Sequence, residues 1–265
     1  MAEWWWAYLA LGAFVGFFSG LLGIGGGSAA VPVLAFIFAA QGESSDHAVH
    51  LALGTALATM LFTSTVSVRS HHLRGAVNWR VLRAMAPGVL AGTFGGALLA
   101  GHLDVKLLSI AFTALIFYFA TQMLRTQTAQ PSRTVPGAAS MNAFGAFIGF
   151  ISSLSATGGA SLVVPFLVKR NVAIHQAIGT AAAVGWPLAF AGALGYAIGG
   201  WNVPGLPAWS VGYIYLPALA GVVGVGMAVA PLGAAVAHRT QGRTLKRVFA
   251  MVLFALATTM LVKFI

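Results

Sequence analysis

Long apolar stretches alternate with short polar connections along almost the whole chain. Most stretches are close to twenty residues, which as a helix matches the thickness of a bilayer core, and they lack the alternation of a barrel strand. Because lipid offers no hydrogen-bond partner to open backbone groups, these stretches are predicted to be helical. The pattern predicts helical segments over residues 4–22, 28–40, 48–68, 82–101, 105–124, 139–156, 159–168, 175–199, 210–236 and 245–264.

One sequence pattern occurs twice. The segment GFFSGLLGIGGGSAAVPVL, Gly16 to Leu34, aligns without a gap with GFISSLSATGGASLVVPFL, Gly149 to Leu167. Further on, HLALGTALA aligns with HQAIGTAAA. Between the copies lies a polar stretch with two prolines, which is typical of a linker. The sequence therefore predicts an N-terminal repeat over residues 1–126, a linker over 127–136 and a C-terminal repeat over 137–265.

Each repeat begins with an apolar element that glycines interrupt, and the charges indicate how this element meets the membrane. If the element folds back on itself, twelve of the 14 Lys and Arg residues share one side and all four acidic residues lie on the other. If it crosses once, seven basic residues fall on each side. Since cytoplasmic loops are rich in Lys and Arg, the first arrangement is favoured. Linker 127–136 and loop 69–83 are then cytoplasmic, and both termini are periplasmic.

In this arrangement each repeat is a re-entrant-like hairpin followed by three transmembrane helices. The number of crossings per repeat is odd, so the second repeat enters the membrane with inverted orientation. The predicted fold is an all-α polytopic membrane protein with two inverted-topology repeats, in the bacterial inner membrane. Such repeats are typical of secondary transporters, whose sites lie near the midplane where broken helices meet.

Composition agrees with this class and excludes several others. Of 265 residues, 59% are hydrophobic, 7% are charged and none is cysteine, which excludes a soluble domain, disulfides and thiolate ligands. The net charge of +10 is scattered over connections, which indicates membrane orientation and not nucleic-acid binding. No span holds a deep carboxylate, a metal-binding cluster or an activated nucleophile. We therefore expect no metal, no cofactor and no enzyme activity, with the lipid bilayer and a small anion as partners and the oligomeric state open.

The glycine clusters are the first candidate site. Glycines spaced by four residues, as at 12, 16 and 20 or at 88, 92 and 96, let helices pack closely, but the clusters do not follow this spacing. A helix that restarts after a break leaves backbone N–H groups free at its positive end, which can bind an anion without a basic side chain. The predicted substrate-binding residues at the two breaks are Gly25, Gly26, Gly27, Ser28, Thr157, Gly158, Gly159 and Ser161.

Two repeated residue pairs are the second candidate. Thr55 and Thr180 each follow a glycine near the start of a span. Their hydroxyls either return to a carbonyl of their own helix or line one central cavity as substrate ligands. His50 and His175 stand five residues earlier, where each is either an interfacial or loop-capping residue or a gating, protonatable one.

The doubled glycine motif, with a GT span after each copy, resembles the TauE/SafE family of sulfite exporters. This resemblance implies export of a small sulfur-containing anion, such as sulfite, an organosulfonate or a related oxoanion. In the second copy GIGGG is reduced to ATGGA, so whether both breaks bind substrate equally stays open. Two other functions also remain open, namely a passive anion channel and a non-transporting membrane scaffold or subunit.

Overall fold

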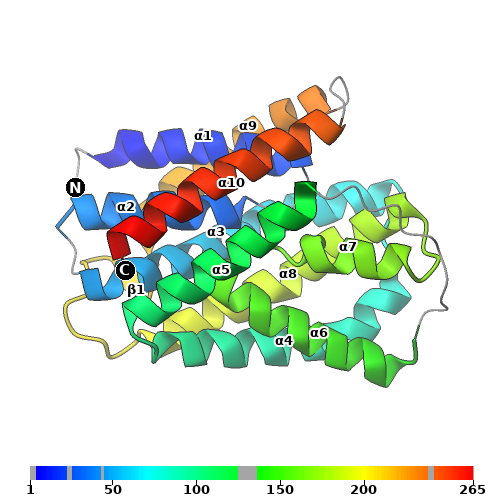
Figure 1. Cartoon of the computed structure of the whole chain (residues 1–265), viewed down its shortest axis with the longest axis horizontal. Coiled ribbons are helices and arrows are strands. Elements are labelled where there is room, and N and C mark those ends of the chain that lie inside the picture. Colours follow the sequence, from blue (N-terminus) through cyan, green and yellow to red (C-terminus); the bar gives the residue numbers. More distant parts are fainter. Residues whose placement is uncertain (1–3, 23–25, 43–44, 125–135, 238–241, 265) are drawn as a thin grey trace.

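The structure is a computed structural model that describes residues 4–22, 26–42, 45–124, 136–237 and 242–264 (Figure 1). Within these ranges the chain forms ten helices and one two-stranded ribbon. The elements in chain order are α1 (Trp5–Leu22), α2 (Gly27–Ala40), α3 (Ser45–Leu73), α4 (Trp79–Gly101), α5 (Val105–Leu124), α6 (Ala138–Ser155), α7 (Ala160–Val168), α8 (Ile174–Gly199), β1 (Ser210–Val211), β2 (Ile214–Tyr215), α9 (Leu216–Ala237) and α10 (Gly242–Phe264).

Helices form over the predicted apolar stretches, with two differences. The loop expected over 69–83 is shorter, because α3 continues to Leu73 and α4 begins at Trp79. The helix expected from residue 210 begins at Leu216, because the preceding residues pair as β1 and β2, with Val211 opposite Ile214. Gly212, at φ 55°, supplies the positive φ that a two-residue hairpin turn requires. β-branched and aromatic residues on both sides of this glycine favour strands over a helix.

Six helices in the described ranges are long and apolar enough to cross a membrane: α3, α4, α5, α6, α8 and α9. Two of the glycine-flanked segments, Trp5–Ser19 and α2, are shorter apolar helices. Helix α10 (Gly242–Phe264) covers the span that we expected over 245–264. The architecture is thus an all-helical bundle of the length and composition that a bilayer demands.

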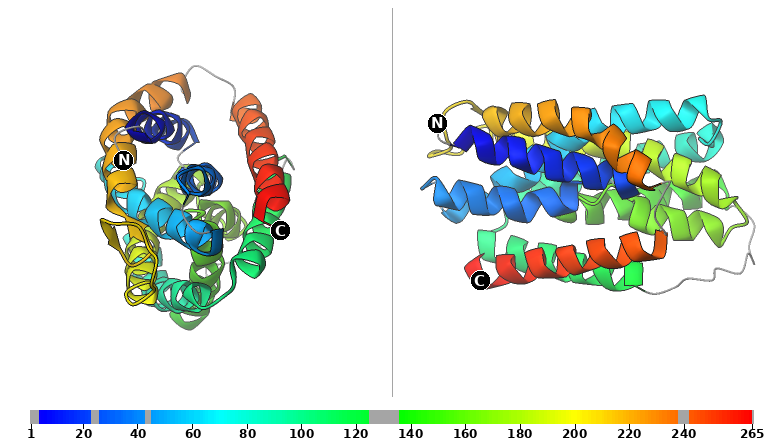
Figure 2. Two further views of the ribbon diagram at one scale, coloured as in Figure 1. Left: turned by 90° about the vertical axis from the view of Figure 1, so that its left-hand side faces the viewer. Right: turned by 90° about the horizontal axis from the view of Figure 1, so that it is seen from above.

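The chain reverses direction after α1 and again after α6. Figure 1 shows α1 running away from the end where the chain begins and α2 returning to it, and Figure 2 shows the two helices side by side. Helix α6 enters from the opposite end of the bundle, and α7 returns to that opposite end (Figure 1). The start of α1 and the end of α10 therefore lie at one end, and the turn between α3 and α4 lies at the other.

Helices from the two halves of the sequence pack against each other through glycines. A Cβ added to Gly16 on α1 would collide with the backbone of Gly226 on α9. A Cβ added to Gly149 on α6 would collide with the Val89 carbonyl on α4, 2.6 Å away. Gly16 and Gly149 are equivalent in the sequence repeat, so the first helix of each repeat packs on a later helix of the other. The two repeats are interlocked and do not form separate bodies.

Candidate functional site

The two glycine breaks meet inside the bundle. A Cβ added to Gly27, the first residue of α2, would lie 2.5 Å from the carbonyl oxygen of Ala156 and 3.4 Å from its side chain. Ala156 directly follows α6 and has φ 47°. Gly159 precedes α7 with φ 72°, a conformation that glycine adopts without strain. Gly25 lies outside the described residues, but Gly26 and Gly27 are buried. The repeated motif therefore brings two chain reversals into direct backbone contact.

Each reversal is followed by the N-terminus of a helix. Helix α2 runs from the breaks toward one end of the bundle and α7 toward the other (Figure 1), so their positive ends face a common region. Among the described residues, no acceptor is found for the backbone N–H groups of Gly27 and Ser28, or for those of Ala160 and Ser161. The first N–H groups of a helix have no acceptor within that helix, so the two helix starts together make a region rich in N–H dipoles.

Hydroxyl groups surround the breaks, and their hydrogen bonds differ. Ser28 and Thr157 are buried, whereas Ser161 is partly exposed. Ser155 Oγ donates to the Ile151 carbonyl at 3.0 Å and lies 2.9 Å from Thr157 Oγ1. With the Ser155 proton used in this way, Thr157 must donate to Ser155. In this arrangement the Thr157 hydroxyl offers a ligand only lone pairs, and an anion would have to displace its present bond.

Two further polar residues near the breaks were missed by sequence reasoning. Ser64 on α3 is buried, and its Cβ lies 4.0 Å from a Cβ added to Gly185, which would itself lie 3.5 Å from the Gly158 carbonyl. Ser152 on α6 is fully buried, and its Oγ has no partner among the described residues. Both stand in runs of hydroxyl residues within apolar spans, TST around Ser64 and SS at Ser152. Such runs are a signal that could have indicated these residues.

The buried residues that the structure describes include no Asp, Glu, Lys or Arg. Their titratable side chains are those of His50 and of four tyrosines, Tyr8, Tyr196, Tyr213 and Tyr215. No group of three or more metal-binding side chains occurs in the same ranges. Whatever binds at the breaks would be held by neutral dipoles, which fits a small anion and leaves a buried cation without a counter-charge.

Thr55 and Thr180 are not brought together at the breaks. Thr55 Oγ1 accepts a hydrogen bond from the backbone N–H of Tyr215 at 3.0 Å, just before α9. Thr180 Oγ1 accepts one from the backbone N–H of Asn78 at 2.9 Å, just before α4. Helices α9 and α4 begin at opposite ends of the bundle (Figure 1), so the two hydroxyls lie toward opposite ends. Each hydroxyl binds the backbone just before a helix of the other repeat.

The two histidines differ from each other. His50 is only 2% exposed, and its Nε2 lies 3.1 Å from the Ala100 carbonyl and 3.0 Å from the Leu103 carbonyl. Its ring stacks on that of Tyr213, with 4.9 Å between centroids. His175, by contrast, is exposed at the start of α8. His50 thus caps the C-terminal end of α4, and the repeat does not carry this role to His175.

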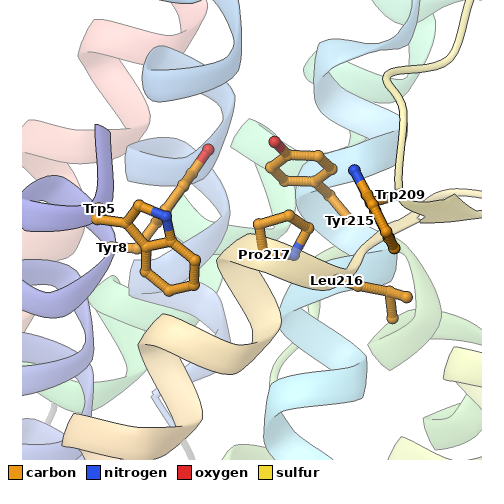
Figure 3. A pocket seen from close by; sticks show the side chains of 6 residues that line it. All are labelled: Trp5, Tyr8, Trp209, Tyr215, Leu216 and Pro217. Carbon is orange, nitrogen blue, oxygen red and sulfur yellow. The ribbon is translucent and has the colours of Figure 1, made fainter. Parts of the chain in front are cut away.

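A separate cavity of about 420 Å³ lies at the end of the bundle where α1 begins. Its lining is almost entirely aromatic and aliphatic (Figure 3) and consists of Trp5, Tyr8, Trp209, Tyr215, Leu216 and Pro217. The rings of Tyr8 and Tyr215 lie 6.2 Å apart, and the Tyr8 hydroxyl accepts a hydrogen bond from Gln41 at 2.6 Å. None of the residues predicted to bind substrate lines this cavity.

Comparison with known proteins identifies the family. A family model described as Sulfite exporter TauE/SafE matches residues 8–260. The chain belongs to the TauE/SafE family. A relative from Haemophilus influenzae, named probable membrane transporter protein, is 35% identical over 263 residues, which cover 96% of this chain and 97% of the relative. A probable membrane transporter protein of Methanocaldococcus jannaschii is 25% identical over 79% of this chain and 77% of its own length.

A third relative, the probable membrane transporter protein YdhB of Bacillus subtilis, is 25% identical over 69% of this chain and 74% of its own length. No solved structure matches the chain. Family membership confirms the resemblance drawn from the doubled glycine motif. The chain is a multi-pass membrane protein of a transporter family and not an enzyme.

Proposed function

We propose that this TauE/SafE protein is a secondary transporter that exports a small sulfur-containing anion across the bacterial inner membrane. The anion, which is sulfite, an organosulfonate or a related oxoanion, binds near the membrane midplane at the N-termini of α2 and α7. The observation that carries the proposal is the contact between Gly27 and Ala156, which brings two breaks from distant parts of the sequence together.

The chemistry at the breaks suits an oxoanion. The N–H groups in the first turns of α2 and α7 are donors that point along the helix axes. Ser28 and Ser161 add hydroxyls one residue further along, while Gly26, Gly158 and Gly159 let a ligand approach the backbone closely. The absence of a buried Lys or Arg among the described residues favours release over tight retention, since a dipole holds an anion less firmly than a paired charge does.

Paired contacts support an inverted repeat with a re-entrant hairpin in each half. The contacts of Gly16 with Gly226 and of Gly149 with Val89 occupy equivalent places in the two halves. The hydrogen bonds of Thr55 and Thr180 to the other half of the sequence are also equivalent in the two halves. The hairpins α1–α2 and α6–α7 open toward opposite ends (Figure 1). Alternating access then takes place by movement of one repeat against the other around the breaks.

Charge at the two ends supports the proposed sidedness. The exposed basic residues Arg69, Arg74, Arg80 and Arg83 lie on the end where α3 ends and α4 begins, and Lys169 lies at the end of α7. Lys106, Lys263 and Asp104 belong to the opposite end. The first end is therefore cytoplasmic, together with linker 127–136, and both termini are periplasmic.

The test measures binding and transport on the purified, full-length protein. Sulfite, methanesulfonate, thiosulfate and sulfate are each added while thermal unfolding is followed, and counterflow of labelled sulfite is measured in proteoliposomes. Ser28→Ala and Ser161→Ala are the site variants. Ser109→Ala is the matched control, because Ser109 is also buried and its hydroxyl donates to the Val105 carbonyl of its own helix at 2.7 Å.

We expect at least one of these anions to raise the unfolding temperature, and this rise to shrink in both site variants but not in Ser109→Ala. Saturable counterflow supports a carrier, whereas conductance without exchange supports a channel. If no anion stabilises the protein and all four proteins behave alike, the proposed site is wrong. If an anion binds but is not moved, the chain is a membrane scaffold or subunit.

A further inference from the structure

We propose that the turn between α3 and α4 is a binding surface for the headgroups of anionic phospholipids. The surface, called here the basic corner, consists of Arg69, Arg74, Trp79, Arg80 and Arg83. All five side chains are exposed. The inference requires only that α3 and α4 cross the bilayer and does not rest on the transport function or on the site at the breaks.

The acidic residues of α3 and of the connection after α4 stand far from the basic corner. Asp46 stands in the first turn of α3 and Asp104 directly follows the C-terminal end of α4, so both belong to the other end of these helices. Among the residues that the structure describes, none of the four arginines has an ion-pair partner within 4.0 Å. Four permanent positive charges thus remain available for an external anion.

The turn that carries these residues is fixed by backbone geometry. Helix α3 ends in a Schellman motif, in which the N–H of Ala76 donates to the His71 carbonyl at 3.0 Å and that of Gly75 to the His72 carbonyl at 2.9 Å. Gly75 has the required positive φ, 65°. The backbone on which these arginines stand is therefore a defined turn between two helices and not an extended loop.

One contact ties the start of α4 to the end of α3, and two further hydrogen bonds fix its first residues. The Trp79 indole donates from Nε1 to His72 Nδ1 at 3.3 Å, with the two rings edge to face. The Asn78 N–H donates to Thr180, and Asn78 Oδ1 accepts from the Val81 N–H at 3.2 Å and caps the helix. The backbone at the start of α4 and the Trp79 ring are thus fixed before a headgroup binds, which lowers the cost of ordering the corner.

The charges at the start of α4 are unfavourable for the helix itself. Arg80 lies in its first turn and Arg83 follows three residues later on the same face. Positive charge at a helix N-terminus opposes the helix dipole, and the first turn contains no acidic residue. A phosphate placed against Arg80 and Arg83 would remove this repulsion and accept two-pronged hydrogen bonds from guanidinium groups.

The depth of the corner favours a lipid over a soluble polyanion. Helices α3 and α4 are candidate membrane spans that end and begin at this turn, so its arginines leave the apolar phase at headgroup level. Trp79 is 40% exposed beside them, and tryptophan prefers this interfacial layer. Juxtamembrane basic clusters attract acidic lipids by the surface charge of the leaflet.

The experiment uses the full-length protein, purified and delipidated in a neutral detergent. Phosphatidylglycerol or phosphatidylcholine is titrated in, and bound lipid is counted by native mass spectrometry. The variants are Arg80→Gln with Arg83→Gln, and separately Arg69→Gln with Arg74→Gln. The matched control is Lys106→Gln with Lys263→Gln, which removes the same charge from the opposite end.

We expect each arginine pair to lower the affinity for phosphatidylglycerol roughly tenfold, while the lysine control and phosphatidylcholine binding stay unchanged. Quenching of tryptophan fluorescence by brominated phosphatidylglycerol should fall in Trp79→Phe relative to the wild type. Each variant's thermal unfolding, followed in parallel, shows that it is folded. Equal binding of both lipids, or equal phosphatidylglycerol binding in all variants, overturns the proposal. So does an RNA or an acidic peptide that binds the corner where phosphatidylglycerol does not.

Discussion

Thr55 on α3 accepts a hydrogen bond from the backbone N–H of Tyr215, 3.0 Å away, across the boundary between the two sequence repeats. Its equivalent, Thr180 on α8, accepts one from the backbone N–H of Asn78 at 2.9 Å. A Cβ on the preceding glycine would in each case collide with the backbone just before the bound N–H, at Tyr213 or Ala76. Each Gly-Thr pair is thus a clamp that positions a helix of the other repeat.

Removing either clamp hydroxyl should destabilise the protein. Thr55→Val and Thr180→Val keep the side-chain shape but leave a backbone N–H without its acceptor, which costs about 1–3 kcal/mol. Thermal unfolding in detergent measures the loss. Thr55→Ser and Thr180→Ser keep the hydroxyl and should remain near wild type.

The control for the clamps is Thr121→Val. Thr121 is exposed, and its hydroxyl donates to the Phe117 carbonyl of its own helix at 2.7 Å, so its removal leaves no N–H without an acceptor. If Thr55→Val and Thr180→Val unfold at the same temperature as Thr121→Val, the hydroxyls do not act as clamps.

Close packing of α4 on α6 depends on individual glycines. A Cβ on Gly92 would collide with the Ala146 backbone, whereas nothing lies within 4 Å of a Cβ on Gly95 of the same helix. Gly92→Ala should therefore destabilise the protein by about 1–3 kcal/mol, and Gly95→Ala should be neutral or stabilise it by up to about 1 kcal/mol. Denaturant or thermal unfolding measures the stability of the two variants. If both substitutions change the stability equally, Gly92 is not required for the packing of α4 on α6.

His50 should matter for stability, and His175 should not. His50→Ala removes the ring that bonds the Ala100 and Leu103 carbonyls and stacks on Tyr213. We expect a loss of about 1–3 kcal/mol, with His175→Ala near wild type because that ring is exposed. Unfolding temperatures test both. A silent His50→Ala would show that these bonds do not hold α3 to α4.

Gly75 should resist substitution because of its backbone and not for lack of room. Nothing lies within 4 Å of a Cβ built on it, yet its φ is 65°, where an L side chain costs about 1 kcal/mol. Gly75→Ala should lower stability by that amount. Gly137→Ala, at a site with equal space and φ −62°, is the control and should unfold like the wild type.

Several features could be predicted from the sequence because they depend on local pattern. The apolar stretches gave helix positions to within a few residues, except at 69–83 and at residue 210. The four-residue spacing of Gly16, Gly92 and their neighbours correctly predicted close helix contacts. The doubled motif led to the family. By contrast, the β-ribbon before α9 was missed, because six residues beside an apolar run resemble the start of a helix.

The role of the candidate residues depended on distant neighbours. The sequence identified Thr55 and Thr180 as a repeated pair, but their hydroxyls bond backbone groups 160 and 102 positions away. It paired His50 with His175, although only His50 is buried. Ser64 and Ser152 near the breaks were not singled out, because the sequence does not show whether a hydroxyl in an apolar span faces lipid, another helix or a binding site.

By itself, the sequence determined that the chain is a helical membrane protein, that it contains a glycine-rich motif twice and which family it belongs to. Those properties follow from hydropathy, residue spacing and motifs, all of which depend on residues that are close together in the sequence. Only the tertiary structure decided that Gly27 meets Ala156 and that the first helix of each repeat packs on the other repeat. The physical reason is that a glycine has no side chain whose chemistry could indicate its partner, so these close contacts are defined only when the helices pack together.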